Sequence, residues 1–173
     1  MARSRRVKGG DEFSELLTGL SGYAVVEVMR SACYAGAGAL ADAVKNEIRG
    51  LPEESGYMHK DKKTGVIKKR NVVGTWDKEM LEQRLGISRI DSDADKSTVA
   101  IGFDGYNDRP TKKYPKGVPI PLIARSIESG SSVRQKNPFM RRAYNKAEPL
   151  VEREMKDAGQ NKLNDIIKRG GKT

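Results

Sequence analysis

Two short stretches of the sequence have residue types and spacings that occur at ligand sites. The first, "GAGALA" from Gly36 to Ala41, has the Gly-x-Gly-x-x-Ala form of a dinucleotide-binding turn. That chemistry needs a strand to end at the first glycine, so that the start of a helix faces the pyrophosphate. Here a helical pattern precedes Gly36, and no acidic residue ends a strand about twenty residues later. The stretch therefore favours a seam where a helix packs closely against a neighbour.

The second stretch, "DSDADKSTVAIG", begins like a calcium-binding loop. Asp91, Asp93 and Asp95 occupy its first, third and fifth positions. Such a loop also needs glycine at position six and a bidentate glutamate at position twelve. This sequence has Lys96 and Gly102 there. We therefore interpret the stretch as a solvated hairpin turn.

The single histidine and the single cysteine do not form a recognisable reactive pair. His59 stands in a charged loop, and a zinc site would need more His or Cys ligands than the chain has. A Ser-His triad needs a histidine held on a scaffold, for which a lysine-flanked loop is poorly suited. Cys33 lies in a run of small residues and is expected to be a buried small side chain. No paired carboxylates stand out. We expect no enzyme, no metal and no cofactor.

The charge balance predicts an anionic partner. The 173 residues contain 33 Lys and Arg against 23 Asp and Glu, a formal net charge of +10. Four basic runs, Arg3–Lys8, Lys60–Arg70, Lys112–Lys116 and Arg134–Arg142, add to this expectation. Few aromatic residues accompany them, so stacking on single-stranded bases is not indicated.

The sequence also indicates the cellular environment in which the chain is expected to fold. One cysteine permits no disulfide within the chain, which suits a reducing environment. The basic start lacks an apolar stretch behind it, so we expect no signal peptide. No window approaches 18 apolar residues, so we expect no membrane span.

The first half of the chain reads as helical. Residues 1–10 are expected to be a flexible basic tail, and Asp11 to cap a short amphipathic helix. A long helix is predicted from Tyr23 to Arg49, ended by Gly50 and Pro52. Its expected apolar stripe consists of Val25, Met29, Ala32, Gly36, Leu40, Val44 and Ile48.

The middle of the chain predicts the β structure. A basic loop at about 55–72, either a strand with a glycine bulge or a flexible ribbon, precedes a short helix at Asp77–Leu85. Strict alternation at Val99, Ile101 and Phe103 then predicts a hairpin that turns near Asp93–Lys96. A proline-rich arm follows at about 105–121, because four prolines there disfavour regular pairing.

Two helices complete the expected fold. Pro121 opens a short helix that Gly130 stops, and Pro138 opens the last one, which runs to about Arg169 with a possible kink at Pro149. Residues 170–173 are expected to be a frayed C-terminus. The fold class is α+β, an antiparallel β-sheet packed against the two long helices, in a single domain at 11–169. The last helix is expected to bury Phe139, Ala143, Ala147, Leu150, Met155, Leu163, Ile166 and Ile167.

The stretch "IARSIESGSSVRQKNPFMRRAY" resembles a motif of the minor tail-component family of long-tailed phages, which includes tail-completion and head–tail joining proteins. The family has Glu-x-Gly-Thr/Ser, a short polar segment with a cation, and Pro-Phe-hydrophobic-Arg-x-Ala before a long C-terminal helix. The matching residues are Glu128, Gly130, Ser131, Pro138, Phe139, Met140, Arg141 and Ala143. The similarity covers about residues 11–56 and 119–168. The middle of the chain is longer and more basic than is usual for the family.

The resemblance implies a structural virion protein of the neck or tail, assembled in the host cytoplasm. It implies a homo-oligomeric ring, expected to be a hexamer, around the DNA channel, which completes the tail and joins it to the head connector. Its partners would be other neck, connector and tail-tube proteins, with genomic DNA passing through the lumen. Residues expected at a subunit or partner interface are Glu128, Gly130, Arg134, Lys136, Pro138, Phe139, Arg141 and Arg142. Residues expected to contact DNA or another anionic partner are Arg3, Arg5, Arg6, Lys62, Lys63, Lys68, Lys69, Arg70, Lys112 and Lys113.

Two alternatives stay open at this point. The charge of +10 and the basic runs would also suit a stand-alone nucleic-acid-binding protein. A phage-encoded nuclease or other enzyme is a third reading, for which the sequence offers no ligand set.

Overall fold

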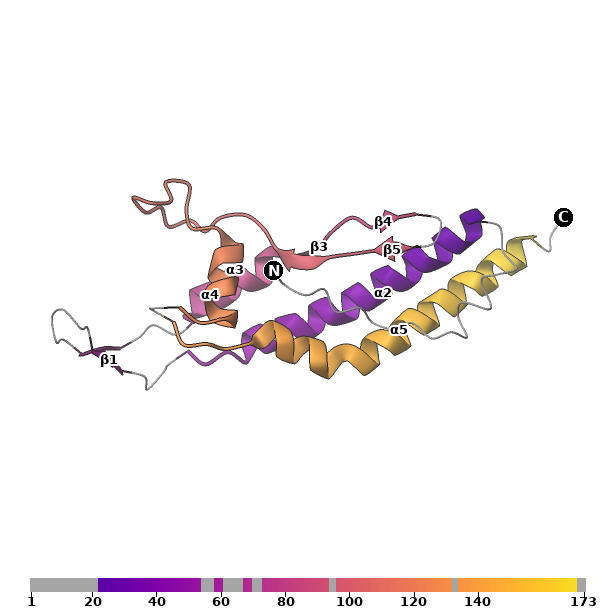
Figure 1. Cartoon of the computed structure of the whole chain (residues 1–173). Coiled ribbons are helices and arrows are strands. Elements are labelled where there is room, and N and C mark those ends of the chain that lie inside the picture. Colours follow the sequence, from indigo (N-terminus) through magenta and orange to yellow (C-terminus); the bar gives the residue numbers. More distant parts are fainter. Residues whose placement is uncertain are drawn as a thin grey trace. The chain divides into compact units, whose positions relative to one another are not determined.

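A computed structural model of the chain describes residues 22–53, 58–60, 67–69, 73–93, 96–131 and 134–170 (Figure 1). The predicted tail at 1–10, the predicted helix after Asp11 and the last three residues lie outside this part. Contacts group the described chain into two compact units. Unit 1 comprises the residues up to Leu40, Ile87–Ala100 and those from Lys146, and unit 2 comprises Ala41–Gly86 and Ile101–Asn145. The single domain at 11–169 therefore stays a prediction.

The α+β fold class is confirmed. In the described residues, the strands form three two-stranded sheets, in which β1 pairs with β2, β3 with β6, and β4 with β5. The helices are α2 (Gly22–Arg49), α3 (Thr75–Arg84), α4 (Ile120–Glu128) and α5 (Phe139–Gly170). The strands are β1 (Met58–Lys60), β2 (Ile67–Lys69), β3 (Leu85–Ile87), β4 (Asp91–Ser92), β5 (Ser97–Thr98) and β6 (Ile101–Phe103).

In unit 1, α2 and α5 lie side by side (Figure 1). Gly36 is buried where the two helices meet, and a Cβ built on it would overlap the side chain of Met155. Glu27 and Lys162 form an ion pair across the same pair of helices, with 3.0 Å between Oε2 and Nζ. The predicted helix seam at "GAGALA" is confirmed at Gly36 and does not extend to Gly38, whose Cβ position is open.

The predicted apolar stripe of α2 is confirmed at Ala32, Gly36, Val44 and Ile48, which are all buried, and is wrong at its other three positions. Ala24, Val28, Ala37 and Ala41 are buried, whereas Val25, Met29 and Leu40 are only half-buried. A spacing of three or four residues gives the period of a helix but not its rotation about its own axis. Small side chains decide that rotation here, because they let another backbone approach closely.

The stripe of α5 also needs correction. Leu150 and Ile167 were expected in the core, and they are 42% and 59% exposed. Val151 is buried instead, four residues after the buried Ala147. The helix continues through Pro149, which cannot donate the backbone hydrogen bond of its turn.

The predicted hairpin is confirmed. In β4 and β5, Asp91 pairs with Thr98 and Ser92 with Ser97. The Asp93 amide donates to the Lys96 carbonyl at 2.7 Å, which closes the turn where the sequence placed it. Asp91 and Asp93 thus belong to a β-hairpin, while Asp95 lies outside the described residues.

The core of unit 2 is built around Phe139. Its side chain is fully buried, and its ring lies 6.1 Å from that of Phe103 at a tilted angle of 59°. Helix α4 adds one apolar face with helical spacing, made of Ile120, Ile123, Ala124 and Ile127. The helix begins at Ile120, one residue before the predicted Pro121, because Pro119 takes the N-cap position. Helix α3 covers 75–84 rather than 77–85.

The predicted basic loop at 55–72 contains regular structure where it is described. Strands β1 and β2 pair in antiparallel register, with His59 opposite Lys68. His59 therefore lies in a strand, which corrects its expected place in a loop. The antiparallel pairing of β1 and β2 makes the described part of this segment a two-stranded β-ribbon.

Among the described helices, none is long and apolar enough to cross a bilayer.

Candidate functional site

The eight predicted interface residues lie at the end of α4, in the connection to α5 and in the first turn of α5. We call residues 128–142, without 132 and 133, the α4–α5 junction. Gly130 follows the end of α4 with φ at +77°, a conformation that favours glycine. The chain then returns, and the Asn137 amide donates to the carbonyl of Ile127 at 2.7 Å. This turn brings the end of one helix beside the start of the next.

Glu128 acts across this turn as a helix cap. Its carboxylate accepts hydrogen bonds from the amides of Met140 at 2.8 Å and Arg141 at 3.3 Å. These amides belong to the first turn of α5, where backbone donors lack partners inside the helix. A negative charge is also favoured there by the helix dipole. The role of Glu128 within this chain is therefore to order the start of α5.

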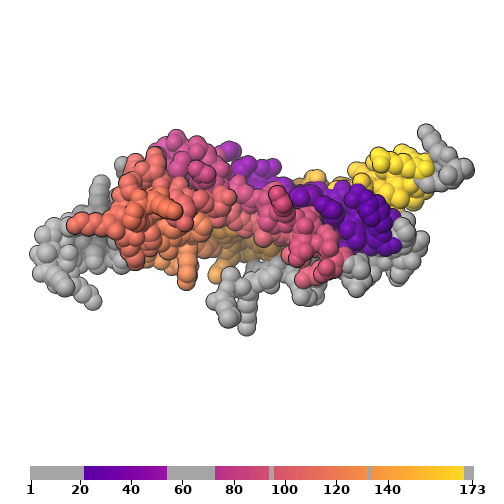
Figure 2. All heavy atoms as spheres, turned by 90° about the horizontal axis from the view of Figure 1, so that it is seen from above, coloured from indigo at the N-terminus to yellow at the C-terminus, as the bar shows by residue number. Residues whose placement is uncertain are grey.

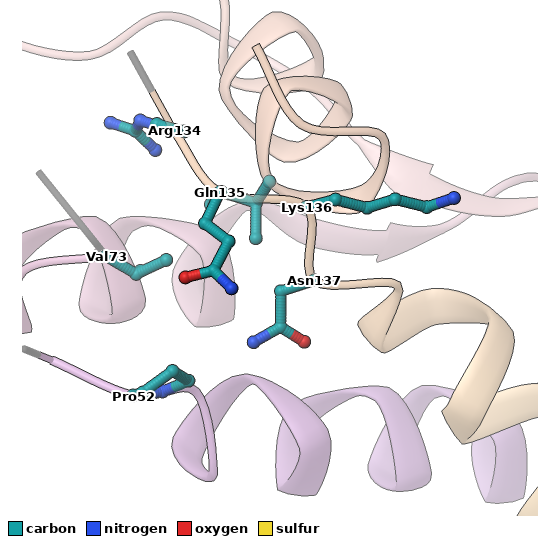
Figure 3. A pocket seen from close by; sticks show the side chains of 7 residues that line it. Pro52, Val73, Arg134, Gln135, Lys136 and Asn137 are labelled. Carbon is teal, nitrogen blue, oxygen red and sulfur yellow. The ribbon is translucent and has the colours of Figure 1, made fainter. Parts of the chain in front are cut away.

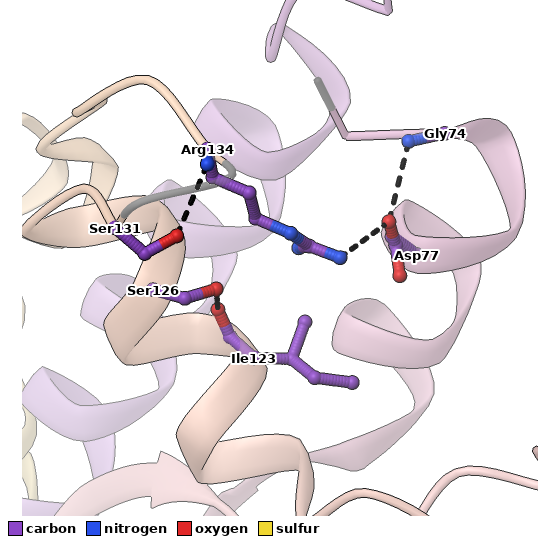
Figure 4. Close-up of polar contacts among 6 residues, drawn as sticks. All are labelled: Gly74, Asp77, Ile123, Ser126, Ser131 and Arg134. Carbon is purple, nitrogen blue, oxygen red and sulfur yellow. Dashed lines mark hydrogen bonds and ion pairs between the residues drawn. The ribbon is translucent and has the colours of Figure 1, made fainter. Parts of the chain in front are cut away.

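Arg134 is held inside unit 2 by an ion pair with Asp77 on α3 (Figure 4). Its Nη2 lies 3.1 Å from Asp77 Oδ2, and the two side chains are only 18% and 15% exposed. Asp77 also accepts from the Gly74 amide at 3.4 Å, while the Arg134 amide donates to Ser131 Oγ at 3.0 Å. This guanidinium ties the junction to the start of α3.

A small pocket of about 100 Å³ adjoins this ion pair (Figure 3). Lys136 on its rim is exposed, which leaves its ammonium accessible to a partner. Among the described residues, two buried polar atoms, Arg134 Nη1 and Asn137 Oδ1, have no hydrogen-bond partner. Such atoms are usually satisfied by water or a ligand group. The lining residues are Pro52, Val73, Ile127, Arg134, Gln135, Lys136 and Asn137.

Arg141 and Arg142 differ in their surroundings, although the sequence grouped them. Arg142 Nε donates to Glu47 Oε2 on α2 at 2.7 Å, within unit 2. Arg141 is exposed, and no described side chain pairs with its guanidinium. Pro138 is half-buried and Phe139 is in the core. Of these four residues, Arg141 is the one best placed to meet another molecule.

Lys112 and Lys113 lie in an ordered loop, residues 105–118, which we call the cationic loop. Both side chains are exposed. Asn107, which the sequence analysis missed, closes the base of the loop and is 8% exposed. Its Oδ1 accepts from the Val118 amide at 2.7 Å and the Arg109 amide at 3.3 Å. An Asn ahead of a Pro- and Gly-containing segment is the signal that could have indicated this turn.

The remaining predicted contacts with an anionic partner are distributed elsewhere. Lys68 and Lys69 lie in β2, where the structure describes the backbone alone. Six further cations lie outside the described residues, namely Arg3, Arg5, Arg6, Lys62, Lys63 and Arg70.

Cys33, expected to be buried, is only half-buried. Its Sγ lies 3.6 Å from the carbonyl oxygen of Ser97, to which the thiol donates. Burial raises the pKa of the Cys33 thiol above its ordinary value of 9.0. A protonated thiol is a poor nucleophile, so this position does not suit nucleophilic chemistry. In the described part of the chain, no three His, Cys, Asp or Glu side chains gather where they could hold a metal ion.

No family model, curated protein or solved structure matches the chain.

Proposed function

We propose that this chain is a structural phage virion protein of the neck or tail. It assembles into a ring around the DNA channel, completes the tail and joins it to the head connector. The observation that carries the proposal is the motif from Glu128 to Ala143, together with its place before the long helix α5.

The geometry of the α4–α5 junction supports this proposal by giving each part of the motif a physical task. Glu128 caps α5, Gly130 takes the left-handed turn conformation, and Phe139 fills the core of unit 2. These three tasks depend on one another, because the cap works only if the turn returns the chain to the end of α4. Residues whose structural roles depend on one another support the resemblance more strongly than unrelated surface residues of the same types would.

A ring also suits the distribution of exposed groups. A closed ring of identical subunits uses two different surfaces of each subunit in a head-to-tail contact. The junction presents Arg141 and Lys136, and the cationic loop presents a separate set of charges. Two distinct exposed surfaces on one unit are what such a contact requires.

The proposed function is tested by measuring ring assembly of the purified chain and head–tail joining in particles. Native mass measurement and electron microscopy of the purified chain, alone and with connector and tail-tube proteins, should reveal a closed ring. Particles made without this chain should accumulate unjoined heads and tails. Normal infectious particles in its absence would falsify the proposal.

A second candidate is a stand-alone nucleic-acid-binding protein. The specific observation in its favour is the exposed positive charge of the cationic loop, added to a net charge of +10. Tight, steeply salt-dependent binding of the monomer to free duplex, without any ring, would favour this function. Ring formation with weak binding by the monomer would favour the neck protein.

A further inference from the structure

The tip of the cationic loop concentrates positive charge. Between residues 109 and 116 the sequence has Arg109, Lys112, Lys113 and Lys116 and no Asp or Glu. The three lysines are exposed, and the salmon-coloured tip stands out from the neighbouring described surface at the left of Figure 2. Among the described residues none of these lysines forms an ion pair.

The base of the loop is closed by backbone pairing. Tyr106 and Pro119 form an antiparallel bridge, and the Asn107 amide donates to the Val118 carbonyl at 2.9 Å. Gly117 has φ at +97°, and a Cβ there would overlap the carbonyl oxygen of Asn107. The loop therefore leaves the fold at one fixed place and returns beside it.

Two consecutive turns shape the tip. The Tyr114 amide donates to the Thr111 carbonyl at 3.0 Å, which closes a turn with Lys112 and Lys113 at its centre. The Gly117 amide donates to the Tyr114 carbonyl at 3.0 Å, which closes a second turn with Pro115 and Lys116 at its centre. Pro in the first central position and Gly in the last are favoured in such turns. All three lysines thus occupy the corners of hydrogen-bonded turns.

Within the tip, Lys113 Nζ lies 5.5 Å from the ring centroid of its neighbour Tyr114. Arg109 instead contacts an aromatic ring outside the loop. Its guanidinium carbon lies 4.1 Å from the ring centroid of Trp76 on α3, a cation–π contact. This contact holds the first half of the loop against α3. Because the backbone is already ordered, little backbone conformational entropy remains to be lost when the tip meets a partner.

We infer that the tip of the cationic loop binds the phosphate backbone of duplex DNA through Lys112, Lys113 and Lys116. Lysine is depleted at protein–protein interfaces, where tryptophan, tyrosine and arginine supply most of the binding energy. Among the cations of the tip, the one arginine is already stacked on Trp76. Phosphates, by contrast, are bound by compact point charges without reading of the base sequence. The chemistry of the tip therefore favours a polyphosphate over an acidic protein surface.

This inference deepens the proposed function, since a ring around the DNA channel needs a surface that tolerates and guides DNA. It can nevertheless fail independently, because phosphate binding and ring closure are measured separately.

The test compares two triple variants that each remove three positive charges. One changes the tip with Lys112→Gln, Lys113→Gln and Lys116→Gln. The matched control changes three exposed lysines of unit 1 with Lys96→Gln, Lys156→Gln and Lys168→Gln. Binding to a short labelled duplex is followed by fluorescence anisotropy between about 50 and 200 mM salt, and both variants are first checked for an unchanged melting temperature and oligomeric state.

In the tip variant, the negative slope of log K against log salt should become shallower by about 3. Binding at low salt should weaken by roughly tenfold or more. The control should keep a slope closer to that of the parent. Equal slopes in the two variants would show that binding depends on net charge alone and would overturn the inference. Loss of binding to connector or tail-tube protein with unchanged DNA binding would also overturn it, since the tip would then be a protein-docking element. Failure of the unchanged chain to form a ring would refute the neck function and leave the DNA result standing.

Discussion

At the scale of single residues, several charged side chains that look like a binding surface in sequence are engaged within the chain. Glu128 caps α5, Arg134 pairs with Asp77, and Arg142 pairs with Glu47. Ion pairs with partly buried partners restrict a side chain more than exposed pairs do. The charges left for other molecules are therefore fewer than the formal count suggests.

Replacing the cap residue tests this division of roles. Glu128→Ala should lower the free energy of unfolding by about 1 kcal/mol, in the range of lost helix caps. The amides of Met140 and Arg141 would lose their acceptor. Urea unfolding followed by circular dichroism measures the change. Glu152→Ala, at an exposed position of α5, is the matched control and should have a much smaller effect. Equal losses in the two variants would argue against the cap.

The ion pair between Glu27 and Lys162 predicts a dependence of stability on pH. The hydrogen bond and the positive charge of Lys162 hold the pKa of Glu27 below its ordinary value of 4.5. A lowered carboxyl pKa in the folded state adds stability that is present above pH 4.5 and is lost as the pH falls through the lowered value. The parent should therefore have a higher melting temperature than Glu27→Gln at neutral pH. The difference between the two melting temperatures should shrink in acid. A difference that persists unchanged far below pH 4.5 would contradict this account.

At the scale of secondary structure, the contact between α2 and α5 depends on one glycine. A Cβ built on Gly36 would lie 2.8 Å from Met155 Sδ and 3.2 Å from Val151 Cγ1. For Gly38, two residues away on the same helix, no other part of the described chain comes within 4 Å of that position. Both are helical glycines, so replacing either by alanine removes the same unfavourable backbone entropy.

This pair of glycines gives a matched prediction. Gly38→Ala should raise the free energy of unfolding by about 0.5–1 kcal/mol, because alanine favours the helix. Gly36→Ala should lower it, since overpacking typically costs about 1–3 kcal/mol and exceeds that gain. Thermal or urea unfolding measures both. Adding Met155→Ala should relieve the overlap, so the double variant should be more stable than the two single effects predict. Stabilisation of similar size at both glycines would mean that α5 does not approach α2 at Gly36.

At the scale of the whole molecule, the α4–α5 junction contains both residues that hold the fold together and exposed residues that another molecule could contact. Arg141 is exposed beside residues whose task is to build the junction. Its neighbour Arg142 is a poorer probe of assembly, because reversing its charge would place two carboxylates together at Glu47. Arg141 separates assembly from folding more cleanly.

If the ring uses the junction as one of its surfaces, Arg141→Glu should leave the subunit folded and prevent ring closure. Like charges facing each other in an interface oppose association. The mass of the assembly, measured beside the melting temperature, reports both properties. Arg89→Glu, on the exposed part of the hairpin segment, is the control and should leave the ring intact. Closed rings of Arg141→Glu would remove the junction from the proposed interface.

The sequence by itself determined where the two long helices begin and end and where the hairpin turns. The hairpin turn at Asp93–Lys96, the stop at Gly130 and the helix opening at Asn137 and Pro138 follow from local rules, because turns and caps depend on neighbouring residues. The small residues around Gly36 likewise predicted a packing seam, and α2 and α5 meet there.

The tertiary structure decided what the charged and apolar residues contact. Periodicity could not show that Val28 rather than Val25 faces inward, or that Val151 replaces Leu150 in the core. Nor could it show that Arg142 pairs with Glu47, ninety-five residues away, while Arg141 stays exposed. A helix fixes the relative angles of its side chains, but only packing against other segments selects the face that is buried. Long-range partners of charged residues depend on that selection, so a local pattern cannot supply them.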